Sequence, residues 1–525
     1  MDPEAKIEDF SCGEGRGPAF TNRSSEKGIS LDMLGKLTCF LRPFLNLRSV
    51  LVLAVLVVGS RAVVDAQDVK VFVSSQAGDR LSSKPDLHFA SEAGAKAPVF
   101  VIQEDVKYQK IDGFGASLLE SGLICINSLP QDKQEEVLRA LFDPQRGAGF
   151  SAMKTVIGAT DFQAAGPFFT YDDTPGDISM QKFSIARDLG PNGEITYIKR
   201  ARKYGSFVLQ APMDYPPDWM LTNAKDHTKQ DVDPKYYDAL ALYYLRYLQE
   251  YEKNGVLINY LSLFNEPGNY TKINYDEIRE LLKNHVGPLL RKSGTKTRIQ
   301  LSEAPTRENA LKNYHLVLDD PEARKYVGGL AYHGYEWTHP DIYRMIAEVH
   351  KKYPQFPMWM TEVCHAYEVG DPRTMPMPLY NFEDGDFWGN MIMSDLEAGA
   401  SAWIYWNMVL DEKGGPWLVS TVHEDPDPNE QHPVVIVNRQ THEISYTGLY
   451  YYLAHFSKFV RPGDYRIEVT GKAEKVRSLA FQSATGKTIL ELLNSRTQPV
   501  QTEIQWHGRT LAVNLPGTSI TTLTW

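Results

Sequence analysis

The chain has 525 residues, 42% of them hydrophobic and 23% charged, and a formal net charge of -11. That length predicts one large domain plus a smaller one. The negative balance, without any Lys/Arg-rich run that carries interleaved aromatic residues, excludes a nucleic-acid partner. The four cysteines are scattered, which argues against a zinc site or a disulfide framework. Whether Cys125 and Cys364 pair stays open.

Residues 1–66 are predicted to be a leader. The basic residues Arg42 and Arg48 precede an apolar run at 50–59, and the small residue Ala66 follows it. A positive flank and an apolar core of about ten residues are typical of a secretory signal, whereas a membrane span needs about 20. We therefore predict cleavage near Ala66 and entry into the secretory pathway, with an uncleaved signal anchor as the alternative.

Residues 67–107 carry strands rich in β-branched residues, and after residue 108 the pattern changes to strand, loop and helix, repeated. About eight such units fit between 110 and 420, which is the number and length of a (β/α)8 TIM barrel, expected here over 108–430. A doubly wound sheet is the alternative, but no glycine-rich phosphate turn follows an early strand. In chain order the predicted elements are strands 69–73 and 98–102, helix 128–142, strands 150–158 and 206–211, helix 237–251, strands 256–264, 298–302 and 328–333, helix 342–349, strand 357–361, helix 388–398 and strand 402–406.

Residues 431–525 change again, to short alternating segments separated by turns that contain Gly486 and Gly508. This pattern predicts an accessory β-sandwich. The strands of 67–107 are expected to complete it, so that the barrel is inserted into the smaller domain.

Two barrel strands end in glutamate. Strand 256–264 runs into Asn265-Glu266-Pro267, and strand 357–361 runs into Glu362. Functional groups of a barrel project from the C-terminal strand ends, and the spacing of these two strands places the glutamates across the barrel mouth from one another. Two facing carboxyl groups are what glycoside cleavage requires, one to protonate the leaving oxygen and one to attack the anomeric carbon.

An ordered set of motifs extends through residues 108–525: Asp112-Gly-Phe-Gly115, Phe169-Thr-Tyr-Asp-Asp-Thr-Pro-Gly-Asp177, Asn265-Glu266-Pro267, Glu362-Val-Cys364, Trp406-Asn407, Gly414-Gly-Pro-Trp417 and His455-Phe-Ser-Lys-Phe459. Together these motifs resemble glycoside hydrolase family thirty, and within it the glucosylceramidase branch. The resemblance implies that Glu266 is the general acid/base and Glu362 the nucleophile of a retaining reaction, for which no metal or organic cofactor is needed.

The resemblance also implies substrate-binding residues around this pair. Asn265 is expected to hydrogen-bond the sugar 2-hydroxyl, a contact that strengthens in the transition state. His333 and Tyr335 match the family's pair beyond the sixth strand, where Tyr335 would orient Glu362; a structural buried pair is the alternative. Trp406 matches the sugar-stacking tryptophan, and core packing is its alternative.

Two departures leave the preferred sugar open. Where the family has an aspartate that grips sugar hydroxyls, this chain has Glu120, which is one methylene longer. Where the branch has a Ser-Pro-Trp turn, this chain has Ala211-Pro212-Met213 and loses the indole. Asn269 begins a glycosylation sequon directly after the catalytic strand, and its occupancy also stays open.

These observations predict a retaining β-glycosidase that hydrolyses β-glucosides, with glucosylceramide as the first expected substrate and therefore a membrane glycolipid as a partner. The alternatives are a β-xylosidase or β-1,6-glucanase of the same family, and an inactive glycan- or glycolipid-binding protein. The signal predicts an extracellular location or, from the resemblance, a lysosome-like or vacuole-like compartment. The sequence leaves the oligomeric state and the pH optimum open.

Overall fold

The computed structural model describes residues 68–91, 97–164, 167–223, 231–335, 340–367, 382–417 and 430–525. The predicted leader and most of the loop that precedes helix α11 (Asp384–Glu397) lie outside these residues. Among the described helices, none is both long and apolar enough to cross a bilayer.

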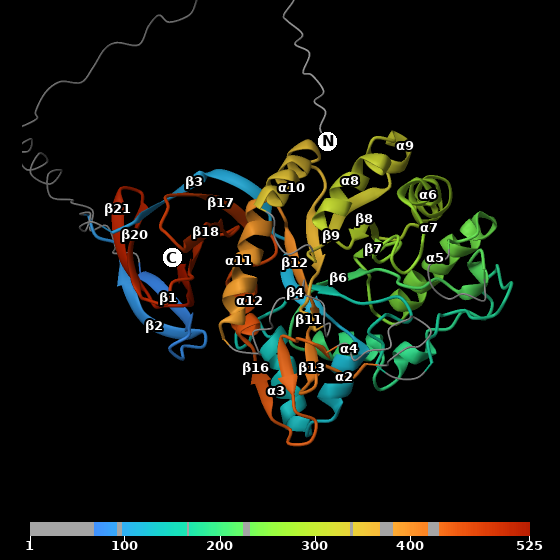
Figure 1. Ribbon diagram of the computed structural model, residues 1–525, viewed down its shortest axis with the longest axis horizontal. Helices are drawn as coiled ribbons and strands as arrows, with labels where there is room; N and C mark the ends of the chain where they lie inside the picture. The colour runs from blue at the N-terminus through green and yellow to red at the C-terminus, as the bar shows by residue number, and fades with distance from the viewer. Residues whose placement is uncertain are drawn as a thin grey trace, which may run out of the picture. The chain divides into compact units, whose positions relative to one another are not determined.

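Eight parallel strands close into a barrel, as the sequence predicts (Figure 1). Around the barrel the order is β10-β12-β4-β5-β6-β7-β8-β9. Their bounds are β4 Gly113–Ser117, β5 Ala152–Lys154, β6 Val208–Ala211, β7 Tyr260–Ser262, β8 Arg298–Ala304, β9 Val327–His333, β10 Met358–Glu362 and β12 Ala402–Asn407. Every residue of β4, β7, β10 and β12 is buried, which explains why these segments read as continuous apolar runs and not as alternating ones.

Helices follow the barrel strands and cover their outer side. They are α2 Glu120–Asn127, α3 Gln131–Phe142, α4 Glu194–Ala201, α5 Tyr237–Lys253, α6 Tyr275–Leu281, α7 Gly287–Ser293, α8 Arg307–Leu318, α9 Pro321–Arg324, α10 Pro340–Lys352 and α11. Local signals set their ends: Thr306 caps α8 by accepting the N–H of Asn309, and Asn274 and Glu277 form a reciprocal capping box at α6. On α5, the predicted tyrosine-rich stripe is buried as core.

A nine-stranded sheet forms the smaller domain, in the order β2-β1-β22-β19-β18-β17-β3-β20-β21. Its strands are β1 Asp68–Ser75, β2 Ser82–His88, β3 Val99–Lys110, β17 Tyr465–Thr470, β18 Val476–Gln482, β19 Thr488–Asn494, β20 Val500–Trp506, β21 Arg509–Leu515 and β22 Ser519–Thr524. The early strands pair with the late ones, so the barrel is inserted into this domain, as predicted.

The segment between barrel and sandwich differs from the sequence prediction, which ended the helices near residue 430. The structure places a small sheet there and then one more helix, α12 Gly448–Phe459. The small sheet consists of β13 Val409–Asp411, β15 Val435–Val437 and β16 Ile444–Tyr446, and a separate pair joins β11 Ala366–Tyr367 to β14 Glu430–Gln431. Thr447 caps α12, whose apolar residues lie at helical spacing and are buried.

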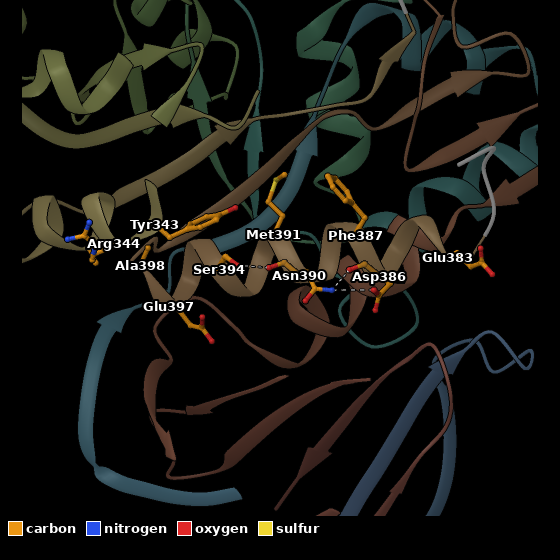
Figure 2. A pocket seen from close by; sticks show the side chains of 11 residues that line it. Tyr343, Arg344, Glu383, Asp386, Phe387, Asn390, Met391, Ser394, Glu397 and Ala398 are labelled. Atoms are coloured by element: carbon orange, nitrogen blue, oxygen red, sulfur yellow. Dashed lines mark hydrogen bonds between the residues drawn. The ribbon is translucent and has the colours of Figure 1, made fainter. Parts of the chain in front are cut away.

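Helix α11 packs against α12, and both contact strands of the sandwich (Figure 1). Along α10 and α11 there is a hollow of about 810 Å³, and Figure 2 shows that Asn390 and Asp386 lie along it. Asn390 also donates to Ser495 of the sandwich and accepts from Arg477. None of the residues that line this hollow belongs to the barrel-strand ends where the predicted site lies.

Candidate active site

The two predicted glutamates meet at the mouth of the barrel. Glu362 is the last residue of β10, and Glu266 follows β7 after a short turn. Both are almost fully buried, with 5% and 6% of their surface exposed. A carboxylate oxygen of each, together with a ring nitrogen of His333, forms a group of atoms that all lie within 4.8 Å of one another. This proximity agrees with the carboxyl separation of about 5–5.5 Å in retaining glycosidases, rather than about 6.5–9.5 Å in inverting ones.

His333 ends β9 and lies between the acidic groups. Its Nδ1 is 2.8 Å from Glu266 Oε1 and 3.6 Å from Glu362 Oε1, and its Nε2 is 3.1 Å from Glu303 Oε2. Burial lowers the pKa of His333, but the charge of Glu362 and the hydrogen bonds to Glu266 and Glu303 raise it to about 9. The raised pKa favours the imidazolium form of the ring, in which both nitrogens carry a proton and can donate to these carboxylates.

Lys154 and Glu303 belong to the same cluster, although the sequence pattern did not single them out. Lys154, at the end of β5, places Nζ 2.6 Å from Glu362 Oε2 and 3.3 Å from Glu303 Oε2. Burial opposes its charge, but these two carboxylates keep the pKa of Lys154 above its usual range. Burial likewise opposes the charge of Glu303, yet Lys154 and His333 lower the pKa of Glu303 to about 2. The cluster therefore interleaves two cations with buried carboxylates.

A distorted backbone at Glu303 and Glu266 directs these two acidic side chains into the barrel mouth. The pairing register of β8 with β9 shifts between Ser302 and Ala304, and within this bulge Ser302 and Glu303 have φ values of 106° and 61°. Glu266 also has a positive φ, 44°, and its N–H donates to the carbonyl of Glu303 at 2.9 Å. Non-glycine residues with positive φ are strained, so the surrounding fold holds the backbone of Ser302, Glu303 and Glu266 in these conformations.

Three of the predicted binding residues contact this cluster. Tyr335 donates to Glu362 Oε1 at 2.9 Å, which is the orienting contact expected from the sequence. The Asn265 side-chain oxygen accepts from Lys154 Nζ at 3.2 Å. The Trp406 ring is buried and its centroid lies 5.1 Å from Lys154 Nζ. The structure therefore gathers these side chains around the glutamate pair.

Asn269 and Tyr270, just beyond Glu266, also turn toward the site. The Asn269 side chain donates to Glu266 Oε2 at 2.7 Å, and the Tyr270 hydroxyl donates to Asp161 Oδ2 at 2.7 Å. Burial and the charge of Glu362 raise the pKa of Asp161 to about 7. Asp161 lies in the loop after β5, where nothing in the local sequence distinguishes it from other loop acids.

Glu120 lies elsewhere. As the first residue of α2, it accepts from Arg187 Nη2 at 3.0 and 3.2 Å. Together with Asp188 and Glu194 it lines a small hollow of about 30 Å³. No contact of Glu120 in the described part of the chain reaches Glu266 or Glu362, and a carboxyl group that does lie near them is that of Asp161. Met213, the other departure, is fully buried after β6.

Family models match the two domains of the structure, the barrel and the sandwich. The model of the glycosyl hydrolase family 30 TIM-barrel domain matches residues 111–460, and that of the family 30 β-sandwich domain matches residues 463–523. The solved structure of SrfJ from Salmonella typhimurium superposes with a TM-score of 0.78 at 20% identity, covering 87% of this chain and 99% of the other.

The chain also aligns with three named relatives. "Putative glucosylceramidase 1" of Caenorhabditis elegans is 28% identical over 447 residues, 81% of each chain. "Lysosomal acid glucosylceramidase" of Mus musculus is 24% identical over 444 residues, 81% of this chain and 83% of the other. "Endo-1,6-beta-D-glucanase" of Neurospora crassa is 27% identical over 378 residues, 69% of this chain and 73% of the other.

Proposed function

The chain belongs to glycosyl hydrolase family 30 and is a glycoside hydrolase, and we propose that it cleaves β-glucosides by double displacement with retention of configuration. The observation that carries this proposal is the close approach of the Glu266 and Glu362 carboxylates. That proximity leaves space for a sugar carbon between them but not for an additional attacking water.

In the first step a Glu362 oxygen attacks the anomeric carbon, and the bond from that carbon to the leaving oxygen breaks. Glu266 transfers its proton to the leaving oxygen. Lys154 and Tyr335 each donate to one oxygen of Glu362, so the carboxylate is held in a fixed orientation. The developing positive charge on the sugar is stabilised by the carboxylates of the cluster.

In the second step Glu266, now ionised, accepts a proton from water while that water attacks the anomeric carbon and releases Glu362. Both oxygens of Glu266 have a nearby donor: His333 lies 2.8 Å from Oε1, and Asn269 donates to Oε2. These contacts hold the side chain in place for both steps.

Glucosylceramide is the substrate that we propose first. Relatives named glucosylceramidase align with more than four-fifths of this chain, which supports a lipid β-glucoside presented at a membrane. The relative named endo-1,6-β-glucanase supports a second candidate, a β-1,6-linked glucan. An inactive glycan-binding protein would need neither the paired glutamates nor the two cations beside them, so catalysis explains the cluster better.

The deciding experiment compares hydrolysis of short-chain glucosylceramide, β-1,6-glucan oligosaccharides and fluorogenic β-glucoside, β-xyloside and β-galactoside. We expect β-glucoside turnover by the wild type and a loss of about a thousandfold or more in Glu362→Gln, because the nucleophile is removed. Proton NMR of the released sugar should show the β anomer first. Release of the α anomer first, or wild-type turnover equal to that of the variant, would contradict the proposal.

A further inference from the structure

Asp214 connects three loops at the barrel mouth. It follows β6 and is only 1% exposed. Its Oδ2 accepts the N–H of Asp161 at 3.3 Å, and its carbonyl accepts from Thr271 Oγ1 at 3.4 Å. The carbonyl of the preceding residue, Met213, accepts the N–H of Asn265 at 2.7 Å. The turn at Met213 and Asp214 thus holds the loop after β5 and the loop after β7 together.

Asp161, which this turn holds, lies beside the catalytic residues. Its carboxyl group receives the hydrogen bond from Tyr270, and it interacts electrostatically with Glu362, Glu266 and Lys154. Asp161 is half-buried, whereas Asp214 behind it is almost completely buried. Of the two carboxyl groups, that of Asp161 is therefore the one placed to meet a sugar hydroxyl.

We propose that Asp214 is a positioning residue, which anchors the backbone of Asp161 beside Glu266 and Glu362, so that the Asp161 carboxyl group is held where it can meet a sugar hydroxyl. This inference rests on the proposed function, since it assigns Asp161 to the sugar-binding part of the same site. It also gives a role to the turn in which Met213 stands where the glucosylceramidase branch has a tryptophan.

The surroundings of Asp214 disfavour its ionised form. Its Oδ1 is buried and has no hydrogen-bond partner among the described residues. Burial and the charge of Asp161 raise the pKa of Asp214 well above its ordinary value, whereas Lys154 opposes this effect. The charge of Glu362 also raises the pKa of Asp214, and the hydrogen bond from the Asp161 N–H lowers it. A carboxylate with an unpaired buried oxygen would pay a large desolvation cost, and a neutral acid pays much less.

The test uses the variants Asp214→Asn and Asp214→Ala and the affinity of the full chain for a non-hydrolysable β-thioglucoside, measured by calorimetry from pH 5 to pH 8. An amide keeps an uncharged acceptor for the Asp161 N–H, so we expect Asp214→Asn to bind within about threefold of the wild type. Alanine removes the anchor, so Asp214→Ala should bind about tenfold more weakly at pH 7.5.

The pH profile separates anchoring from general damage. Wild-type affinity should increase as pH rises through about 7, because an ionised Asp161 makes the stronger hydrogen bond to a hydroxyl. Asp214→Asn should keep this inflection. In Asp214→Ala the released Asp161 becomes better hydrated, so its pKa falls and the inflection moves to lower pH.

A matched control is Glu491→Ala in β19. Glu491 is likewise buried with one carboxylate oxygen that lacks a hydrogen bond in the described part of the chain, but it lies in the sandwich. The Glu491→Ala substitution should lower the melting temperature and leave the affinity for the β-thioglucoside unchanged. Equal losses in Asp214→Asn and Asp214→Ala, or wild-type affinity in Asp214→Ala, would overturn the inference. Failure of the wild type to hydrolyse β-glucosides would instead overturn the proposed function, because the binding assay does not need turnover.

Discussion

The barrel mouth and the contact of α12 with the sandwich each contain a fully buried histidine, and the two side chains have very different pKa values. In the barrel mouth, His333 faces Glu266, Glu303 and Glu362, and its pKa rises to about 9. On α12, His455 instead hydrogen-bonds to the hydroxyl groups of two sandwich residues, and burial lowers its pKa to about 3.

Because both rings are fully buried, their hydrogen-bonding and charged partners account for the difference between the two pKa values. Thr522 and Ser74, the partners of His455, are neutral, and the carboxyl group of Glu491 lies 4.0 Å away. Burial also raises the pKa of Glu491 well above its ordinary value, which favours the neutral form of that acid. The buried contacts of His455 therefore favour neutral groups, whereas the buried groups of the barrel mouth include charged pairs suited to chemistry.

The largest test of this contrast removes a cation from the barrel mouth. Lys154→Met leaves Glu303 and Glu362 without their shared partner, and breaking a buried ion pair in this way costs about 3–5 kcal/mol. We expect that loss in the free energy of unfolding, measured with denaturant, together with a fall in kcat of about a hundredfold.

Lys235→Met is the control for Lys154→Met, because Lys235 is exposed and pairs with Asp233 at the surface. Such a pair contributes little, so stability should change by less than about 1 kcal/mol. If both variants were equally stable, the buried carboxylates would not depend on Lys154, and the charge balance described here would be wrong.

The second test follows stability with pH. The folded pKa of His333, about 9, lies above the usual value of about 6.5 for histidine, so its contribution is complete below about pH 6.5 and disappears as pH rises through 9. The folded pKa of His455, about 3, lies below the usual value, so its contribution is complete above about pH 6.5 and decreases as pH falls toward 3. The effect amounts to roughly 3 kcal/mol for His333 and roughly 5 kcal/mol for His455.

Melting temperatures of the wild type, His333→Gln and His455→Gln between pH 4 and pH 10 measure both effects. We expect His333→Gln to weaken the alkaline decline and His455→Gln to weaken the acid decline, because each variant removes one titrating ring. Only His333→Gln should reduce turnover. The opposite assignment of the two declines would show that the carboxylates around His333 do not hold its proton.

The sequence predicts the barrel because its strands and helices repeat at regular spacing, and it predicts Glu266 and Glu362 because each follows an apolar strand. Glu303 was missed for a physical reason. It lies inside the segment Arg298–Ala304, and only a bulge with positive φ angles turns its side chain into the site. Strand periodicity carries no sign of such a bulge.

The sequence also failed to predict which acidic residues of the loops and helices, apart from Glu266, lie at the site. Asp161 enters the site through its hydrogen bonds to Tyr270 and Asp214, which join loops distant in the chain. Glu120 occupies a motif position that pointed to the sugar, yet the start of α2 places it beside Arg187. A motif fixes the order of residues along the chain, but tertiary packing decides which carboxyl group meets the substrate.

The prediction with the smallest expected effect concerns the hydrogen bonds that orient Glu266. Asn269→Ala removes the hydrogen bond to Glu266 Oε2 but leaves Oε1 beside His333, so one of two orienting contacts remains. A hydrogen bond of this kind contributes about 1 kcal/mol, and we expect kcat/KM for a β-glucoside to fall about fivefold. Asn254→Ala is the control, because the Asn254 side chain donates to the carbonyl of Glu250 at the end of α5 and not to a carboxylate of the site. Asn269→Gln should not restore activity, since the longer side chain displaces the amide from Oε2. Unchanged kcat/KM in Asn269→Ala would mean that His333 alone positions the acid.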